Sequence, residues 1–320
     1  MKIPTFKELL EEYPRIASME RMKSERPCKT TVSNNLFGVR KILELLGNDG
    51  ASLDQPITWL TKNRIDRFLL RAAEKGMPAL SSWTYVHRLR GVTARWTTSY
   101  YEALGWKVSP FKLPYCRKRL PRYERPDRSV LRKVKDWVVD LWEEEDRRKW
   151  LAATLMLEFG IRNGDVRRLT WANFRERDNG VCLCYTPHKT EQSSGRRVAW
   201  PVHPTIWTML CEARSCVAKH QAYCRAGIPN SPHGITNSDP VVPGASYIFV
   251  LLNRELRANG IFKAQKGLYE LRKVCIDHVY QRYGAEMASS LSGDDIRTVM
   301  RYYADPSQPN IGMTRIFDLL

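Results

Sequence analysis

The sequence predicts a mainly helical α+β protein of two domains, with one small β-hairpin in the second domain. Three observations support this fold class. The chain has 320 residues, which is long for one hydrophobic core and favours two domains. Apolar residues recur at helical spacing through most of the sequence. Two short strand-like runs, at residues 181–186 and 197–202, flank a turn and predict the hairpin.

The expected boundaries follow composition. A helical domain is predicted over residues 1–110, a basic linker over 111–128, a second domain over 129–305 and a C-terminal tail over 306–320. Prolines in and beside the linker favour an extended chain. They are Pro110, Pro114, Pro121 and Pro126.

The first domain is predicted to contain four helices, at residues 5–15, 31–46, 57–73 and 81–104. Thr5 is a suitable N-cap for the first helix, because Glu8 three residues later completes a capping box. The last helix is the longest and has an apolar stripe rich in aromatic side chains. A stripe at helical spacing is more typical of a core than of a surface that stacks on bases. The stripe comprises Trp83, Val86, Leu89, Val92, Trp96 and Tyr100.

The net charge of +18 predicts a polyanionic partner, and double-stranded DNA is the partner that we expect. Basic residues lie on the polar faces of the first-domain helices and crowd the linker, where they can contact phosphates without reading bases. Arg125 and Arg128 add to the linker charge. A solvated basic surface and a linker that acts only as a hinge are the alternatives. The predicted DNA contacts are Arg88, Arg90, Arg95, Arg117, Lys118, Arg119 and Arg122.

Several functional classes are disfavoured by what the sequence lacks. No apolar run is long enough to span a membrane, and the N-terminus has no signal-peptide core, so a cytoplasmic, nucleoid-associated protein is expected. The eight cysteines form no Cys-x-x-Cys pair and no zinc-finger spacing, which favours reduced thiols and no bound metal. The sequence has no P-loop and no carboxylate cluster typical of a two-metal nuclease, so we expect no cofactor.

In the second domain, helices are predicted at residues 129–144, 146–159, 247–259, 269–282, 285–291 and 296–303. Gly160 is expected to end the second of these helices, directly before Ile161 and Arg162. Asp165 is then placed to cap the following helix or to orient the Arg162 guanidinium.

Two arginines, a lysine and a late tyrosine follow one another in an order that favours phosphoryl transfer. Arg162 and Arg272 can hold the non-bridging oxygens of a phosphodiester with paired, planar donors. Lys189, at the mouth of the hairpin, can protonate the departing 5′ oxygen. A phenolate from the pair Tyr302 and Tyr303 is a suitable nucleophile once a cationic pocket lowers its pKa. The resulting phosphotyrosine keeps the bond energy, so no ATP is required.

Over roughly residues 125–305 this pattern resembles the tyrosine recombinase (phage-integrase) family, and the first domain looks like that family's helical core-binding domain. Phe-Gly-Ile-Arg162-Asn-Gly-Asp165 is similar to the family's first arginine motif, and Lys189 is similar to its hairpin lysine. Tyr269-Glu-Leu-Arg272 is similar to the His-x-Leu-Arg motif. The resemblance therefore implies a catalytic domain with Arg162, Lys189 and Arg272 in the site, supported by Asp165.

Leu291-Ser-Gly293 is similar to the family's Leu-Gly-His segment, and the nucleophile stands eleven residues after that leucine. The count implies Tyr302 (291 + 11 = 302), with Tyr303 as the neighbour to test. Two positions depart from the pattern. Tyr269 replaces histidine, and a phenol that titrates near about pH 10 is a poorer proton shuttle at neutral pH. Gly293 stands where a histidine or tryptophan usually supports the scissile phosphate.

The resemblance implies a site-specific DNA recombinase that integrates, excises, inverts or resolves DNA through a 3′-phosphotyrosine. It also implies a homotetramer on paired sites, with accessory DNA-bending proteins as further partners. Two alternatives remain open: a DNA-binding protein with weakened catalysis, and a strand-passing enzyme like the type IB topoisomerases. The apolar end of the chain, residues 313–320, can dock either on a neighbouring protomer or on its own domain.

Overall fold

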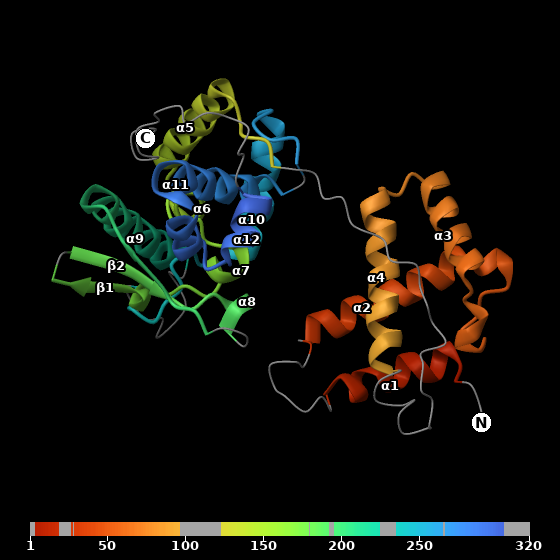
Figure 1. The fold of residues 1–320 in the computed structure, drawn as a ribbon. Coiled ribbons are helices and arrows are strands. Elements are labelled where there is room, and N and C mark those ends of the chain that lie inside the picture. Colours follow the sequence, from red (N-terminus) through yellow and green to blue (C-terminus); the bar gives the residue numbers. More distant parts are fainter. Residues whose placement is uncertain are drawn as a thin grey trace. The chain divides into compact units, whose positions relative to one another are not determined.

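The chain forms two compact units, Met1–Pro121 and Arg122–Leu320. Each unit has its own hydrophobic core and is built mainly from helices (Figure 1). The predicted fold class is confirmed, because helices dominate the described residues and one small antiparallel sheet accompanies them. The computed structural model describes residues 4–18, 27, 29–96, 123–178, 180–191, 195–224, 235–264 and 266–303.

The helices described in the first unit are α1 (Phe6–Ser18), α2 (Lys29–Leu45), α3 (Lys62–Glu74) and α4 (Ala79–Trp96). The predicted capping box is present before α1. The Thr5 amide donates to the Glu8 carboxylate (2.8 Å), and the Glu8 amide donates to the Thr5 hydroxyl (3.2 Å). The start of α1 is therefore fixed by local hydrogen bonds.

The apolar stripe of α4 lies in the core of the first unit, where α4 packs along α2. Val86, Leu89 and Val92 are almost fully buried, so the prediction of a core stripe is confirmed for these residues. The side chain of Trp96 and the whole of Tyr100 lie outside the described residues.

The second unit is organised around α6 (Arg148–Leu157). All residues from Trp150 to Leu157 are buried, because α6 is covered by neighbouring helices on all sides. The helices described in this unit besides α6 are α5 (Arg128–Glu143), α7 (Asn163–Val166), α8 (His188–Glu191), α9 (Pro204–Cys224), α10 (Ala245–Ala258), α11 (Gly267–Ser292) and α12 (Ile296–Tyr302).

The sheet has three antiparallel strands in the order β1 (Phe174–Arg177), β2 (Gly180–Tyr185) and β3 (Val198–Pro201). Strands β2 and β3 match the predicted hairpin, whereas β1 and α9 were not predicted. Leu183 of β2 faces the core, and α9 packs against the sheet (Figure 1). Between β2 and β3 the chain forms the short helix α8.

Helix α11 spans two of the predicted helices, which are joined by a kink at Gly284. Gly284 has a left-handed φ of 83°, which other residues rarely adopt, so the predicted break at this glycine is confirmed as a kink. Gly293 ends α11 in the left-handed region (φ 66°). A short turn then leads into α12, and this turn faces the start of α7 and the first half of α11 through its side chains.

Candidate active site

The two arginines singled out by the sequence meet at one carboxylate, that of Asp294. The Nη2 atom of Arg162 donates to Oδ1 of Asp294, and Nη2 of Arg272 donates to Oδ2 at 2.7 Å. The Arg272 side chain is fully buried and that of Arg162 is 14% exposed. Two arginines 110 positions apart in the sequence (272 − 162 = 110) thus converge on a single anion. Paired planar donors of this kind suit a carboxylate or a phosphate.

Arg272 is held by backbone carbonyls as well as by Asp294. Its Nη1 donates to the carbonyl of Gly160, and its Nη2 also donates to the carbonyl of Ser292 (3.3 Å). Burial acts to lower the pKa of Arg272, but Tyr303 and Asp294 outweigh burial and the net shift raises this pKa. Arg272 is therefore a permanent cation in a fixed orientation.

The sequence predicted Gly160 at the C-cap of a helix over residues 146–159; the helix α6 ends two residues earlier, at Leu157, and Gly160 follows in the turn. It has a left-handed φ of 57°, and a Cβ atom there would lie 3.3 Å from the sulfur of Cys275. Glycine is thus favoured both by the backbone conformation and by the close approach of α11. The consequence is that the Gly160 carbonyl reaches Arg272 while the next residues carry Arg162 to the N-cap of α7.

Asp165 links the first arginine to the lysine segment. Its Oδ2 lies 3.7 Å from Nη1 of Arg162, and its Oδ1 accepts from the backbone amide of His188 at 2.8 Å. His188 is the first residue of α8, so Asp165 orients the guanidinium and also caps the helix that carries Lys189. Lys189 is exposed and has no salt bridge among the described residues.

The phenol that lies beside the arginines belongs to Tyr303. Its hydroxyl is 2.7 Å from that of Tyr269, and the Arg272 guanidinium carbon is 5.3 Å from its ring centroid. Tyr303 is 4% exposed, and its burial raises the pKa of the phenol. The positive charge of Arg272 acts in the opposite direction but does not outweigh burial. Tyr302, which the count from Leu291 selected, is half-buried and packs against the core of the unit.

Gly293 directs no side chain at the arginines and has no space for one. A Cβ atom at Gly293 would lie 2.7 Å from Cγ of Pro187 and 3.4 Å from Cγ2 of Val198. The residue that faces the arginines is the next one, Asp294. The side chains that lie against Arg272 are thus those of Asp294 and Tyr303, each one position after the residue that the resemblance implied. A count of eleven from Ser292 ends at Tyr303 (292 + 11 = 303).

Sequence reasoning missed three residues of this region: Asp294, Tyr185 and Arg196. The signal for Asp294 was its place directly after a helix-ending glycine in Leu-Ser-Gly-Asp. Tyr185 ends β2, and its buried hydroxyl has no hydrogen-bond partner among the residues that the structure describes. Burial raises the pKa of Tyr185, although the charge of Arg272 opposes this effect.

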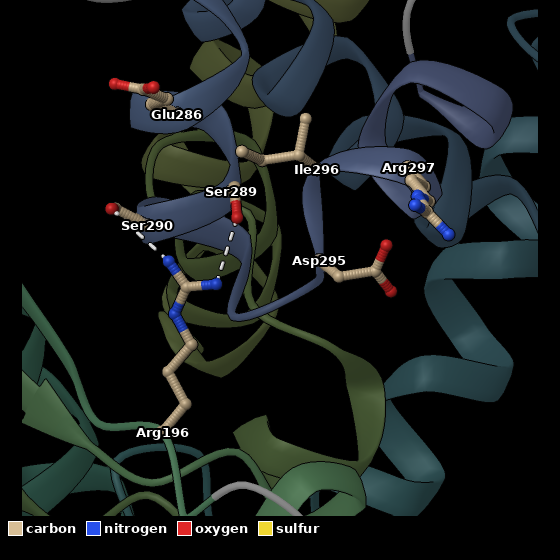
Figure 2. Close-up of a pocket in the computed structure, with 7 residues that line it drawn as sticks. All are labelled: Arg196, Glu286, Ser289, Ser290, Asp295, Ile296 and Arg297. Atoms are coloured by element: carbon tan, nitrogen blue, oxygen red, sulfur yellow. Dashed lines mark hydrogen bonds between the residues drawn. The ribbon is translucent and has the colours of Figure 1, made fainter.

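Arg196 pins the turn that carries Asp294. It precedes β3, and its Nη1 donates to the Ser289 hydroxyl (2.9 Å) and to the Asp294 carbonyl (3.1 Å). Figure 2 shows the Arg196 side chain reaching Ser289 and Ser290 at the rim of a pocket of about 690 Å³. The segment before β3 is thereby tied to the turn between α11 and α12.

The predicted DNA contacts are only partly within the described residues. Arg88 packs its aliphatic stem over Gly38 of α2 and holds its guanidinium 5.5 Å from the Tyr85 ring, whereas Arg90 is exposed. The side chain of Arg95, and Arg117, Lys118, Arg119 and Arg122 as a whole, lie outside those residues.

Arg125 was expected to belong to a linker that lies along the DNA backbone, but the structure places its side chain against α11. Its guanidinium binds the buried carboxylate of Asp277 in α11 with two hydrogen bonds of 2.6 and 3.2 Å. The two side chains are only 11% and 4% exposed, so Arg125 is engaged inside the second unit.

The described residues contain no group of three histidine, cysteine or acidic side chains arranged to hold a metal ion. None of the helices in the described ranges is both long and apolar enough to cross a membrane. Cys182, Cys184, Cys211, Cys216 and Cys275 are free thiols.

A helical second unit with a small sheet, preceded in the chain by a helical first unit, is also the fold of several solved tyrosine recombinase structures. The resemblance predicted from the sequence is confirmed for the fold by several solved structures. A chain of the lambda integrase tetramer bound to a Holliday junction matches with a TM-score of 0.57 at 16% identity, over 98% of this chain and 80% of that chain.

Two further structures match over nearly their whole length. The XerH site-specific recombinase bound to its difH substrate has a TM-score of 0.60 at 13% identity, covering 96% of this chain and 95% of that one. The Tn1549 transposon integrase in complex with a circular intermediate DNA has a TM-score of 0.56 at 15% identity, covering 94% and 95%. Neither a protein-family model nor a curated protein matches the sequence. At these identities the likeness establishes the fold.

Proposed function

We propose that this protein is a site-specific DNA recombinase that cleaves and rejoins DNA through a 3′-phosphotyrosine. The observation that carries the proposal is the convergence of Arg162 and Arg272 on one carboxylate beside a phenol. Guanidiniums that bind the two oxygens of a carboxylate can equally bind two non-bridging oxygens of a phosphodiester. Such fixed cations stabilise the charge that develops as the phosphorus is attacked.

In the proposed reaction the phenol loses its proton to solvent, the resulting phenolate oxygen attacks the scissile phosphorus, and the bond from phosphorus to the 5′ oxygen breaks. Arg162 and Arg272 hold the non-bridging oxygens, and Lys189 donates a proton to the departing 5′ oxygen. Asp165 keeps Arg162 and the lysine segment in register through its two contacts. A 5′ hydroxyl from another strand then reverses the step and releases the tyrosine.

The nucleophile that the geometry favours is Tyr303, because its phenol lies against Arg272 and Tyr269. Tyr302, supported by the count from Leu291, is the competing choice. In the DNA-free protein the pKa of Tyr303 is raised, mainly by burial, so the phenol is protonated at neutral pH. Attack therefore requires that bound DNA and the arginines stabilise the phenolate.

A trapping experiment separates the two tyrosines. The target DNA is first selected by binding to the protein from the region that flanks its own gene. Duplexes with a nick beside the cleavage site are then prepared, because the short cleaved end diffuses away and the covalent adduct accumulates. We expect the wild type and Tyr302→Phe to form a denaturant-resistant adduct, and Tyr303→Phe to form none. Tyr302→Phe is the matched control, since it removes the same hydroxyl one residue away.

Loss of the adduct in Tyr302→Phe alone would restore the count from Leu291. Specific binding without an adduct in any variant would instead support a recombinase-fold DNA-binding protein. That second candidate is favoured by Gly293, where Pro187 leaves no space for the phosphate-supporting side chain. Relaxation of supercoiled DNA regardless of sequence would support a topoisomerase-like enzyme.

The proposed partner is double-stranded DNA, in keeping with the charge of +18. Because exchange between two duplexes requires four strand cleavages, we propose four protomers on paired sites. The matched lambda integrase structure is a tetramer on a Holliday junction, and the other two matched chains are also bound to DNA. Accessory DNA-bending proteins and a location at the nucleoid are further expectations of this function.

A further inference from the structure

The carboxylate of Asp294 lies where two arginines offer a binding position for an anion, which we call the anion position. We propose that Asp294 occupies the place of the scissile phosphate in the DNA-free protein and is displaced when a phosphodiester binds. The inference rests on the proposed function, because it takes the arginine pair to be the phosphate-binding group. It makes Asp294 a residue that determines which anions can enter the site.

The hydrogen-bonding groups around the anion position support a ligand with more oxygens than a carboxylate. Asp294 uses one oxygen for each guanidinium. The Nη1 atom of Arg162 and the Nε atom of Arg272 are nevertheless buried without a hydrogen-bond acceptor among the described residues. Buried donors normally have a partner. A tetrahedral phosphate can present further oxygens to such donors, which a planar carboxylate cannot.

The backbone of the turn is fixed, so only the Asp294 side chain has to move. Its carbonyl accepts from Arg196 (3.1 Å) and from the Ser289 hydroxyl (2.6 Å), and its amide donates to the Ser292 hydroxyl (3.1 Å). These bonds do not involve the carboxylate. Rotation about the Cα–Cβ bond therefore releases the anion position without unfolding the turn shown in Figure 2.

An internal carboxylate discriminates between free phosphate and DNA. Because Asp294 is tethered beside the arginines, it competes at a high effective concentration, and a free phosphate must overcome that competition. DNA held at many other phosphates can do so, since its scissile phosphate is tethered as well. The carboxylate also offsets part of the positive charge of the two guanidiniums until DNA arrives.

The test replaces the carboxylate by an amide of the same shape. Thermal melting is followed for the full-length wild type, Asp294→Asn and Asp295→Asn while inorganic phosphate is raised, with sodium chloride holding ionic strength constant. The control Asp295→Asn removes the same charge from the adjacent residue, whose carboxylate contacts Thr298 rather than the arginines. Asparagine also remains a good N-cap there.

We expect phosphate to stabilise Asp294→Asn selectively. Its melting temperature should rise by about 5 °C when phosphate is in roughly hundredfold excess over its dissociation constant. The apparent dissociation constant for phosphate should be at least about tenfold weaker in the wild type and in Asp295→Asn. Adding Arg162→Ala to Asp294→Asn should abolish the response.

Equal phosphate responses in all three proteins would overturn the proposal. An Asp294→Asn or Asp294→Ser protein that fails to fold in phosphate as well as in chloride would also overturn it, because phosphate should replace the missing carboxylate. The assay needs no DNA target. A selective response without any covalent DNA adduct would therefore leave this inference standing while the proposed recombinase activity fails, and an adduct without the response would do the reverse.

Discussion

Gly293 shows how one residue determines the geometry of the site. Its left-handed conformation lets α11 end and the chain turn, so that Asp294 faces the arginines. Pro187, from the segment between β2 and α8, lies directly against it. Glycine is therefore required by conformation and by contact at the same position, which explains why a larger motif residue is absent there.

We predict that Gly293→Ala lowers the free energy of unfolding of the second unit by more than the cost of the left-handed backbone conformation alone. The left-handed conformation costs an alanine about 1–2 kcal/mol, and the clash with Pro187 adds about 1–3 kcal/mol of overpacking. Urea unfolding measures the difference. Gly260→Ala is the matched control, since its φ of 61° is close to that of Gly293 and no atom lies within 4 Å of its Cβ position. Equal losses in the two variants would show that Pro187 yields.

At the scale of elements, the structure ties segments that are distant in the sequence. Arg125, which precedes α5, binds Asp277 of α11 across 152 positions. Arg196, which precedes β3, holds the turn between α11 and α12. These contacts connect the segments before α5 and before β3 to α11, the helix that contributes Arg272. The orientation of Arg272 therefore depends on the packing of the whole unit rather than on its local sequence.

Removing the first tie should destabilise the second unit. We expect Arg125→Gln to lower the free energy of unfolding by about 3–5 kcal/mol, because it removes the ion pair that Arg125 forms with the nearly buried carboxylate of Asp277. Denaturant unfolding measures this loss, and Arg128→Gln provides an exposed arginine from the first turn of α5 as the control. If Arg125→Gln instead weakened DNA binding and left stability unchanged, the linker role expected from the sequence would be correct.

The sequence was sufficient for some elements and insufficient for others. The capping box at Thr5 and the turn at Gly160 shortly after α6 were predictable, because capping and left-handed turns depend on nearby residues. Strand β1 was missed because Phe-Arg-Glu-Arg directs only one apolar side chain at the core. Helix α9 had a usable signal in Ile206, Leu210, Ala213 and Val217, which recur at helical spacing and are buried.

The site illustrates the same division. Arg162 and Arg272 could be selected as candidate site residues from the sequence. Their shared contact with Asp294 could not be predicted, because it joins three separate segments of the chain. The register of the last motif was one residue uncertain for a physical reason. Two adjacent tyrosines differ by about 100° around a helix, and only the packed helix decides which phenol faces the arginines.

At the scale of the whole molecule, the two units are independent in their cores. The buried cluster of residues 6–92 in the first unit and that of residues 131–303 in the second share no member among the described residues. Each buries the apolar faces of its own helices. We therefore expect the second unit to be stable without the first, and we propose that the first unit contributes contacts to DNA.

We predict that a fragment of residues 122–320 folds without the first unit. Its thermal unfolding, followed by tryptophan fluorescence, should show one cooperative transition, and it should bind DNA more weakly than the full chain with a smaller dependence on salt. The same fragment with Arg125→Gln is the control. If the fragment has the native packing of the second unit, this variant should melt at a lower temperature. A fragment without any cooperative transition would show that the first unit is part of the fold.

Asp165 has a consequence for how variants of this protein are interpreted. A single carboxylate restrains a guanidinium with one oxygen and starts a lysine-bearing helix with the other. In the proposed mechanism, a substitution of Asp165 therefore disturbs both the arginine that holds the phosphate and the lysine that protonates the leaving group. The losses of activity measured for Asp165 and Lys189 variants should therefore be less than additive in the double variant, since Asp165 positions the helix that carries Lys189.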